Sequence, residues 1–321
     1  MVKTTKIIAC GAYLPSKIVS NQELSKIVDT SDEWITSRTG IKQRHLIEND
    51  ETTSFLAINA AKLALERSKL KPSDIDLIIV ATTTPDKTFP ATAVLVQASL
   101  GIEKGAAFDV QAVCAGFVYA LTIADSMIKS GSASNAIVIG AEAMSKIIDW
   151  QDRNTCVLFG DGAGAVILSP ELNNTGKGIL STSIFSDGRY EPILHADGGV
   201  CSTQTSGFVR MQGKEVFKHA VEKMSESMLG VLGKSGLSLG DVDHVIPHQA
   251  NMRILEAVAT RLKLPQEKMV ITLDKHANTS AASIPLALNH LFESGKLKNG
   301  DLILTAAIGG GLSWGACLFR W

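Results

Sequence analysis

The two halves of the chain resemble each other, and this internal repeat narrows the possible folds more than any other feature. The segment LKPSDIDLIIVAT (70–82) matches LSLGDVDHVIPHQ (237–249), and each reads as a helix end, an acidic turn and a strand. Further along, KSGSASNAIVIG (129–140) matches ESGKLKNGDLIL (293–304). Self-similarity of this kind indicates a duplicated supersecondary unit. The sequence therefore predicts two similar structural units, one in each half.

Short β-branched runs alternate with longer amphipathic ones along both halves. Such alternation is typical of α/β proteins with buried sheets. Strands are expected at 77–81, 106–110, 136–140, 163–168, 244–246, 302–305 and 316–319, and helices at 54–69, 114–129, 214–232, 253–262 and 283–293.

The repeat also predicts a spacing between equivalent positions. Two Ser-Gly pairs, at 130–131 and 294–295, lie 164 positions apart. The same shift takes Cys114 to Asn278, so we expect these two residues at equivalent places in the two units.

The expected boundary between the units is the turn-rich, polar stretch at 169–178. It divides the chain into an N-terminal domain, 1–170, and a C-terminal domain, 171–321.

Composition and charge exclude several classes of protein. The 321 residues include 31 basic and 32 acidic side chains, so the net charge of −1 argues against a nucleic-acid scaffold. No stretch resembles the run of about 18 apolar residues that spans a membrane, and no signal-like run opens the chain. Five cysteines, an odd number, suggest free thiols in a reducing compartment. We therefore expect a soluble cytoplasmic protein that binds neither nucleic acid nor membranes.

Cys114 stands where the strand-like run 106–110 gives way to an apolar helical pattern. A lone cysteine is most often a small buried hydrophobe. A helix N-terminus, however, presents unpaired N–H groups and a positive dipole end, which favour the thiolate over the thiol. The small Ala-Gly pair that follows leaves room for a substrate. This setting predicts a nucleophile, and the other four cysteines lack it.

Three further stretches contain candidate functional residues. His248, in VIPHQANMRI, follows a strand at the edge where α/β sheets display their ligands, although a plain surface histidine fits the same position. Asn278, in HANTSAAS, reads either as a ligand-facing amide or as a helix cap. Three glycines, at 309–311, would let backbone N–H groups approach a ligand closely.

The order Cys, His, Asn also occurs in papain-like cysteine proteases, where His and Asn follow the cysteine by about 130–150 residues. Here the gaps are 134 and 164. The protease signature around the cysteine is missing, because Cys114 is followed by Ala-Gly-Phe. The duplicated α/β pattern also fits such a protease poorly.

Together these segments resemble the β-ketoacyl-[acyl-carrier-protein] synthase III family, the initiating condensing enzymes of bacterial fatty-acid synthesis. The similarity runs from GAYLPSKIVSNQEL near the start to GGGLSWGACLFRW at the end. It includes SDEWITSRTGIKQRH, CAGF, NTCVLFGDGAGAV, VFKHAV, PHQAN and NTSAAS, in that order. The resemblance implies a thiolase-like fold, in which two duplicated α-β-α halves form a five-layered α-β-α-β-α core within a homodimer.

The resemblance also implies catalytic roles. Cys114 matches the family nucleophile, which takes the acyl group from an acyl-CoA thioester. His248 and Asn278 match the pair that binds the malonyl thioester carbonyl, where two preorganised donors stabilise the enolate-like oxygen left by decarboxylation. A neutral imidazole and an amide supply those donors without adding charge. The backbone N–H groups of Cys114 and Gly310 would form the oxyanion hole.

Binding residues carry over in the same way. Trp34 and Arg153 match the pair that sandwiches the CoA adenine, and Arg38 suits the CoA phosphates. The implied contacts are Trp34, Arg38, Arg153, Gly213 and Asn251 for CoA, Phe89 across the dimer for the partner's acyl pocket, and Lys218, Arg253, Arg261 and Lys263 for the acidic acyl carrier protein. Lys214 departs from the pattern, because the family commonly has asparagine there beside the pantetheine arm.

The implied reaction is a decarboxylating condensation of acetyl-CoA with malonyl-[acyl-carrier protein], with no permanent cofactor and no metal. A related condensing enzyme of secondary metabolism with another primer is the alternative. Thiolase itself fits less well, because its second catalytic cysteine precedes a C-terminal glycine run and Cys317 follows it. Hydroxymethylglutaryl-CoA synthase would need a glutamate near Cys114, for which the sequence offers no strong candidate. A non-catalytic binding subunit would usually have lost Cys114 or His248.

Overall fold

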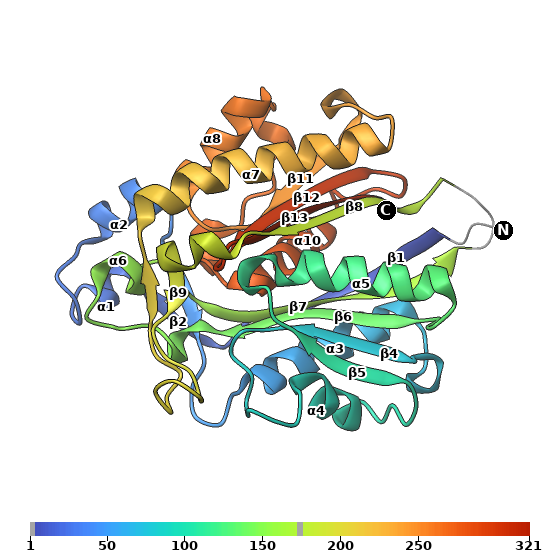
Figure 1. Ribbon diagram of the computed structural model, residues 1–321, viewed down its shortest axis with the longest axis horizontal. Helices are drawn as coiled ribbons and strands as arrows, with labels where there is room; N and C mark the ends of the chain where they lie inside the picture. The colour runs from blue at the N-terminus through green and yellow to red at the C-terminus, as the bar shows by residue number, and fades with distance from the viewer. Residues whose placement is uncertain (1–3, 172–175) are drawn as a thin grey trace.

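Two β-sheets and the helices that cover them form five layers in the computed structural model, which describes residues 4–171 and 176–321 (Figure 1). The first sheet has the order β1-β7-β6-β4-β5 and consists of β1 (Thr4–Tyr13), β7 (Asp161–Glu171), β6 (Ala136–Ala143), β4 (Leu77–Ala81) and β5 (Ala106–Val110). The second has the order β11-β12-β13-β8 and consists of β11 (His244–Pro247), β12 (Leu302–Gly309), β13 (Ser313–Arg320) and β8 (Gly178–Ser186).

Helices form the middle and the two outer layers. The middle layer is α5 (Gly116–Ser130) with α10 (Ser283–Glu293), which pack between the sheets. Below the first sheet lie α3 (Thr53–Ser68) and α4 (Thr92–Ser99), and above the second lie α7 (Gly213–Lys234) and α8 (Met252–Leu262) (Figure 1). This arrangement confirms the predicted five-layered α/β fold.

Short elements complete the chain. They are β2 (Lys17–Ser20) paired with β3 (Gln43–Leu46), β9 (Leu194–Ala196) paired with β10 (Val209–Met211), the helices α1 (Asn21–Leu24), α2 (Asp32–Thr39), α6 (Arg153–Cys156) and α9 (Leu273–His276), and the 3₁₀ turns η1 (Pro72–Asp74), η2 (Val113–Ala115), η3 (Met144–Lys146), η4 (Gly188–Ile193), η5 (Leu239–Asp241), η6 (Gln266–Lys268) and η7 (Ser280–Ala282).

The two sheets share one pairing pattern, as the internal repeat predicts. In the first, β4 pairs parallel with β6, β6 antiparallel with β7, and β7 antiparallel with β1. In the second, β11, β12, β13 and β8 repeat these pairings in the same order. Residues 172–175, inside the expected boundary, lie outside the described residues. The division into domains 1–170 and 171–321 therefore stays a prediction.

The expected equivalence of Cys114 and Asn278 is wrong by three residues. Val113 and Ser280 both have positive φ, at 48° and 50°, and each opens the 3₁₀ turn before a middle-layer helix. The shift is therefore 167 positions here and pairs Cys114 with Ala281. Because α10 has 11 residues where α5 has 15, the second copy is shorter by about one turn. After this shorter helix, the separation between equivalent residues is again 164 positions, as seen at the Ser-Gly pairs 130–131 and 294–295.

One helical stretch, 113–130, is long and apolar enough to cross a membrane by length and composition, contrary to the expectation from the sequence. It consists of η2 and α5, and 56% of it is buried inside the molecule. Because α5 packs against strands of both sheets, it is apolar around much of its surface. These are the properties of a core helix.

Arg44, on β3, is fully buried and supports the core next to the site. Its guanidinium donates to Asn21 Oδ1 at 2.8 Å and to the Val157 carbonyl at 2.9 Å, and burial lowers its pKa to about 10. We expect Arg44→Met to lower the free energy of unfolding by about 3 kcal/mol, because two buried acceptors lose their donor. Urea unfolding measures this, with the exposed Lys42→Met as control. A loss below about 1 kcal/mol would contradict the interpretation.

Candidate active site

Cys114 lies in the middle of η2, the single turn that joins β5 to α5. Val113, just before it, adopts a φ that a β-branched residue rarely takes, and such strain is concentrated at functional sites. Gly309, at the end of β12, packs directly on this turn. A Cβ atom at that position would lie 2.7 Å from both the Cys114 nitrogen and the Ala112 oxygen. The glycine run thus brings the second sheet against the backbone of Cys114.

His248 follows β11 and is 2% exposed. Its Nδ1 lies 2.7 Å from Ser283 Oγ, which also accepts from the Gln249 backbone N–H at 3.4 Å. This pattern is satisfied when Ser283 donates to Nδ1, so that the ring proton sits on Nε2. Burial lowers the pKa of His248 to about 3, which keeps the imidazole neutral. His248 therefore offers one uncharged N–H donor.

Asn278 is 5% exposed, and its backbone bonds to Leu158 and Gly160. Its side-chain oxygen accepts from the Ser280 backbone N–H at 2.9 Å. The oxygen thus bonds to the first residue of η7, although Thr279 and not Asn278 occupies its N-cap position, and the amide NH₂ stays available as a donor.

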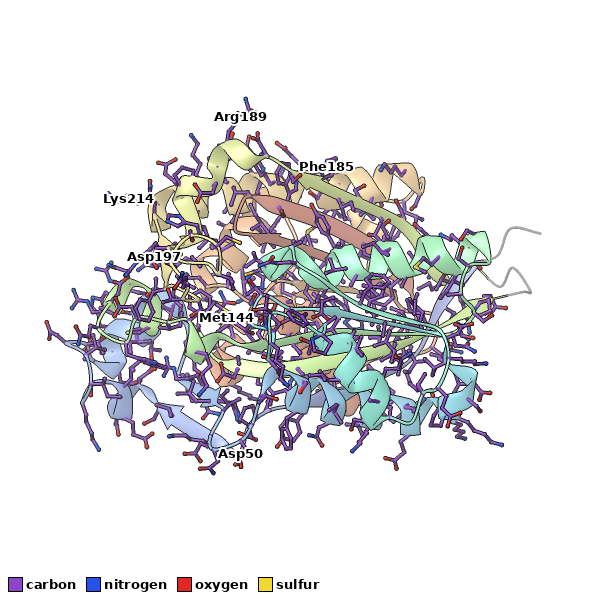
Figure 2. All side chains as sticks on the ribbon, turned by 60° about the horizontal axis from the view of Figure 1, so that its bottom comes forward. Asp50, Met144, Phe185, Arg189, Asp197 and Lys214 are labelled. Carbon is purple, nitrogen blue, oxygen red and sulfur yellow. The ribbon has the colours of Figure 1, made fainter. Side chains whose placement is uncertain are left out.

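These three side chains line one cavity of about 890 Å³. The same cavity is lined by the remaining residues expected in catalysis and CoA binding, namely Trp34, Arg38, Arg153, Gly213, Asn251 and Gly310. In Figure 2, Lys214 projects from one end of the molecule and Met144 lies toward its middle, and both line the cavity. Lys214 is exposed and Met144 is 1% exposed, so the cavity reaches from the surface into the core. Within residues 4–171 and 176–321, no three His, Cys, Asp or Glu side chains are grouped to hold a metal ion.

Two guanidinium groups surround the indole of Trp34 at the mouth of this cavity. The Arg38 and Arg153 guanidinium carbons lie 5.2 and 4.8 Å from the ring centroid. Arg153 is held by a bond to the Asp29 carbonyl at 2.9 Å. A flat base could insert between Trp34 and Arg153 if they moved apart by about 3.5 Å, the thickness of one aromatic layer.

Burial of Cys114 opposes the predicted preference for the thiolate, which stays a prediction. Burial raises the pKa of Cys114 to about 12, because the thiolate loses its solvation. The Ser280 hydroxyl, a hydrogen-bonding neighbour, lowers the pKa by less, and the negative charge of Glu142 raises it further. Because burial favours the neutral thiol, a nearby proton acceptor would help Cys114 to react.

Glu142 is the residue that sequence reasoning missed. It sits near the end of β6, is fully buried, and accepts hydrogen bonds from Thr84, Thr83, Thr82 and Ser280. Burial raises its pKa to about 7. The expectation that no glutamate lies near Cys114 is therefore wrong. A glutamate within the otherwise apolar run AIVIGAEA was the available signal.

Four predicted residues do not line the cavity: Phe89, Lys218, Arg261 and Lys263. Phe89 is 82% exposed and does not line it. Of the four basic residues expected to meet the carrier protein, Arg253 lines the cavity, and the other three lie on the exposed faces of α7 and α8 or just beyond α8. Arg261 is paired with Glu226 at 3.5 Å.

Comparisons with known proteins identify the family of this chain. A family model described as 3-oxoacyl-[acyl-carrier-protein] synthase III matches residues 108–188, and the model for the C-terminal part of that family matches 232–321. The β-ketoacyl-[acyl-carrier-protein] synthase III of Ehrlichia canis is 55% identical over 319 residues, 99% of this chain and 100% of that protein. The corresponding protein of Rhodospirillum centenum is 55% identical over 98% of each chain.

Solved structures show the same fold. The 3-oxoacyl-[acyl-carrier-protein] synthase III of Aquifex aeolicus superposes with a TM-score of 0.94 at 52% identity, covering 99% of this chain and 100% of that one. A priming β-ketosynthase of a polyketide biosynthetic pathway superposes with a TM-score of 0.94 at 34% identity, covering 99% and 96%. The fold, the cavity and the length of these matches together place the chain in the β-ketoacyl-[acyl-carrier-protein] synthase III family.

Proposed function

We propose that this protein starts fatty-acid synthesis by condensing acetyl-CoA with malonyl-[acyl-carrier protein], giving acetoacetyl-[acyl-carrier protein], CO₂ and CoA. The observation that supports this most strongly is one cavity lined by Cys114, His248, Asn278 and the Trp34–Arg153 pair. The alternative, a condensing enzyme of secondary metabolism, is less well supported, because the polyketide enzyme is 34% identical and the fatty-acid synthases about 55%.

In the first step the thiolate of Cys114 attacks the acetyl-CoA carbonyl. The oxyanion that develops would be met by the backbone N–H groups of Cys114 and Gly310, both on the cavity wall. The C–S bond to CoA then breaks, and the CoA thiolate takes a proton from water. Cys114 is left as an acetyl thioester.

In the second step malonyl-[acyl-carrier protein] loses CO₂. Nε2–H of His248 and the NH₂ of Asn278 would donate to the thioester oxygen as negative charge develops there. Because burial keeps His248 neutral, it contributes a donor at any ordinary pH. The carbanion attacks acetyl-Cys114, forms the new C–C bond, and expels the Cys114 thiolate.

Basic side chains near the mouth of the cavity suit two anionic groups. Arg38, Lys214 and Arg253 line the cavity and match the CoA phosphates or the phosphopantetheine arm. Lys218 on α7 and Arg253 on α8 would meet the acidic carrier protein, with Lys263 and, if its pair with Glu226 opens, Arg261. Lys214 adds a cation where asparagine is common in the family.

We further propose that the protein works as a cytoplasmic homodimer in which Phe89 closes the partner's acyl pocket. Phe89 is 82% exposed and outside the cavity of its own chain, so its ring is free to contact a second copy. We expect Phe89→Ala to shift kcat/KM from acetyl-CoA toward isobutyryl- and octanoyl-CoA by about 10-fold or more, since excluding a methylene is worth about 1–3 kcal/mol. Phe55→Ala, an exposed phenylalanine outside the cavity lining, is the control.

Rates with the three primers, measured for wild type and both variants, test this proposal. Equal wild-type rates with acetyl-, isobutyryl- and octanoyl-CoA would contradict the proposal that Phe89 forms a wall of the partner's acyl pocket. An unchanged primer preference in Phe89→Ala would contradict it as well.

The proposed reaction is tested by incubating the protein with acetyl-CoA and malonyl-[acyl-carrier protein] and analysing the carrier protein by mass spectrometry. We expect acetoacetyl-[acyl-carrier protein] and release of CO₂. Formation of a branched or long-chain product in preference to acetoacetyl would instead favour the alternative primer.

A further inference from the structure

Glu142 is a fully buried carboxylate held by donors that carry no charge. Its Oε2 accepts from Thr84 Oγ1 at 2.7 Å, the Thr83 backbone N–H at 3.0 Å and Thr82 Oγ1 at 3.2 Å. Its Oε1 accepts from Ser280 Oγ at 3.0 Å. Oε2 is therefore saturated, while Oε1 keeps the capacity to bind a proton on the side that faces Ser280.

Ser280 lies between this carboxylate and the catalytic residues. Its backbone N–H holds the Asn278 side chain, and its hydroxyl bonds to Glu142 and neighbours the Cys114 thiol. The turns η2 and η7 pack against each other, and η7 lies so close to β6 that a Cβ at Gly140 would collide with the Ala281 carbonyl. The turn that contains Ser280 is thus packed against both η2 and β6.

A serine hydroxyl has one proton to donate, and Ser280 donates it to Glu142. This determines the direction of the hydrogen bonds that lead from Cys114 through Ser280 to Glu142. With Ser280 donating to Glu142, the lone pairs of its oxygen remain free to accept from the neighbouring Cys114 S–H. Moving one proton along each bond converts thiol and carboxylate into thiolate and carboxylic acid without changing the net charge. Such a transfer avoids the cost of a second buried charge.

We propose that Glu142 takes the Cys114 thiol proton through Ser280 and holds it while Cys114 carries the acyl group. This inference rests on the proposed function. The S–H bond breaks as the thiolate attacks, one proton passes from Cys114 to Ser280, and the proton of Ser280 passes to Oε1 of Glu142. When condensation expels the Cys114 thiolate, the proton returns by the same route. The CoA thiolate takes its proton from water, so the cycle balances. Glu142 is a positioning and proton-holding residue that acts through Ser280.

Other ionisable groups near β6 are engaged elsewhere. Asp161, on the neighbouring β7, accepts from Ser145 and from the Ile47 backbone. His248 is bonded to Ser283 and stays neutral. Two of the helices packed against β6 also carry charged side chains. Arg67 of α3 pairs with Glu293 at the end of α10, and Asp125 of α5 pairs with Lys129 on the same helix. Cys114 is therefore the titratable partner of Glu142.

The pH dependence of Cys114 alkylation by iodoacetamide, followed by peptide mass mapping, tests this proposal. In wild type the rate should rise to about pH 7 and then level off, because the thiolate–carboxylic acid pair has a constant population above that pH, and it should rise again only at higher pH, where thiolate and carboxylate are both ionised. In Glu142→Gln and in Ser280→Ala the rate should keep rising about tenfold per pH unit, because only free thiolate reacts. Glu142→Asp should partly restore the plateau. Alkylation needs neither CoA nor carrier protein, so its outcome is independent of the proposed reaction.

Asp161→Asn is the matched control, because it removes a buried carboxylate from the adjacent strand without touching Ser280, and it should keep the wild-type profile. Alkylation of the exposed Cys201 in the same samples records the reagent's behaviour. If Glu142→Gln does not fold, Ser280→Ala carries the test alone. A continuous rise in wild type, an unchanged profile in Ser280→Ala, or the same change in Asp161→Asn would overturn the proposal.

Discussion

Cys114→Ala is expected to lower the rate of acetoacetyl-[acyl-carrier protein] formation by more than about 10³-fold, since among the described residues that line the cavity Cys114 is the one cysteine able to carry the acetyl thioester. Decarboxylation of malonyl-[acyl-carrier protein] should persist, because His248 and Asn278 still donate to the thioester oxygen. Separate assays of released CO₂ and of condensation product measure the two activities. Loss of condensation with retained decarboxylation would show that Cys114 is needed for the first activity and not for the second.

Cys201→Ala is the control for this variant, because it removes an exposed cysteine outside the cavity lining and should leave both activities unchanged. Condensation by Cys114→Ala within about tenfold of the wild-type rate would contradict the assignment, since removal of a nucleophile costs far more.

His248→Ala and Asn278→Ala are expected to have the opposite effect, in that malonyl decarboxylation is lost while acetylation of Cys114 is kept. Each removes one donor to the developing enolate oxygen, and one such donor is worth about 10²–10³ in rate. Decarboxylation should fall by that factor in each variant, and by less than the product of the two in the double variant, because the donors act on one oxygen. Acetylation of Cys114 by acetyl-CoA should remain within about tenfold of wild type.

His195→Ala serves as the matched control for these variants, because His195 lines the same cavity without an assigned role. It should keep decarboxylation near the wild-type rate. If His248→Ala or Asn278→Ala lost acetylation as completely as Cys114→Ala, the division of labour between the two steps would be wrong.

Much of the fold was predictable from local sequence pattern. The expected strand 77–81 coincides with β4, and the expected helix 283–293 coincides with α10, because apolar runs bounded by polar turns identify both ends. Strand ends were less predictable. The strand expected at 136–140 continues as β6 to Ala143, because pairing with β7 extends it past the apolar run. The extension contains Glu142, so the missed strand end and the missed residue have one cause.

Tertiary burial explains the other differences. The sequence places Cys114 at a helix start, where a lower pKa is expected, but the surrounding sheets and η7 bury the thiol and raise the pKa instead. The network of Glu142 and Ser280 joins residues 138 positions apart, so no local pattern could predict it. The cavity residues were identified through resemblance of motifs, since Trp34 and Arg153 carry no local sign of a shared site.

The central claim is that Cys114 carries the acyl group between the two steps. Intact-mass measurement of wild type after incubation with acetyl-CoA alone, followed by peptide mapping, tests it most directly. We expect a mass increase of one acetyl group located on Cys114, removed again when malonyl-[acyl-carrier protein] is added. An unmodified Cys114 in a protein that still forms acetoacetyl-[acyl-carrier protein], or an acetyl group on another residue that the malonyl substrate discharges, would contradict it.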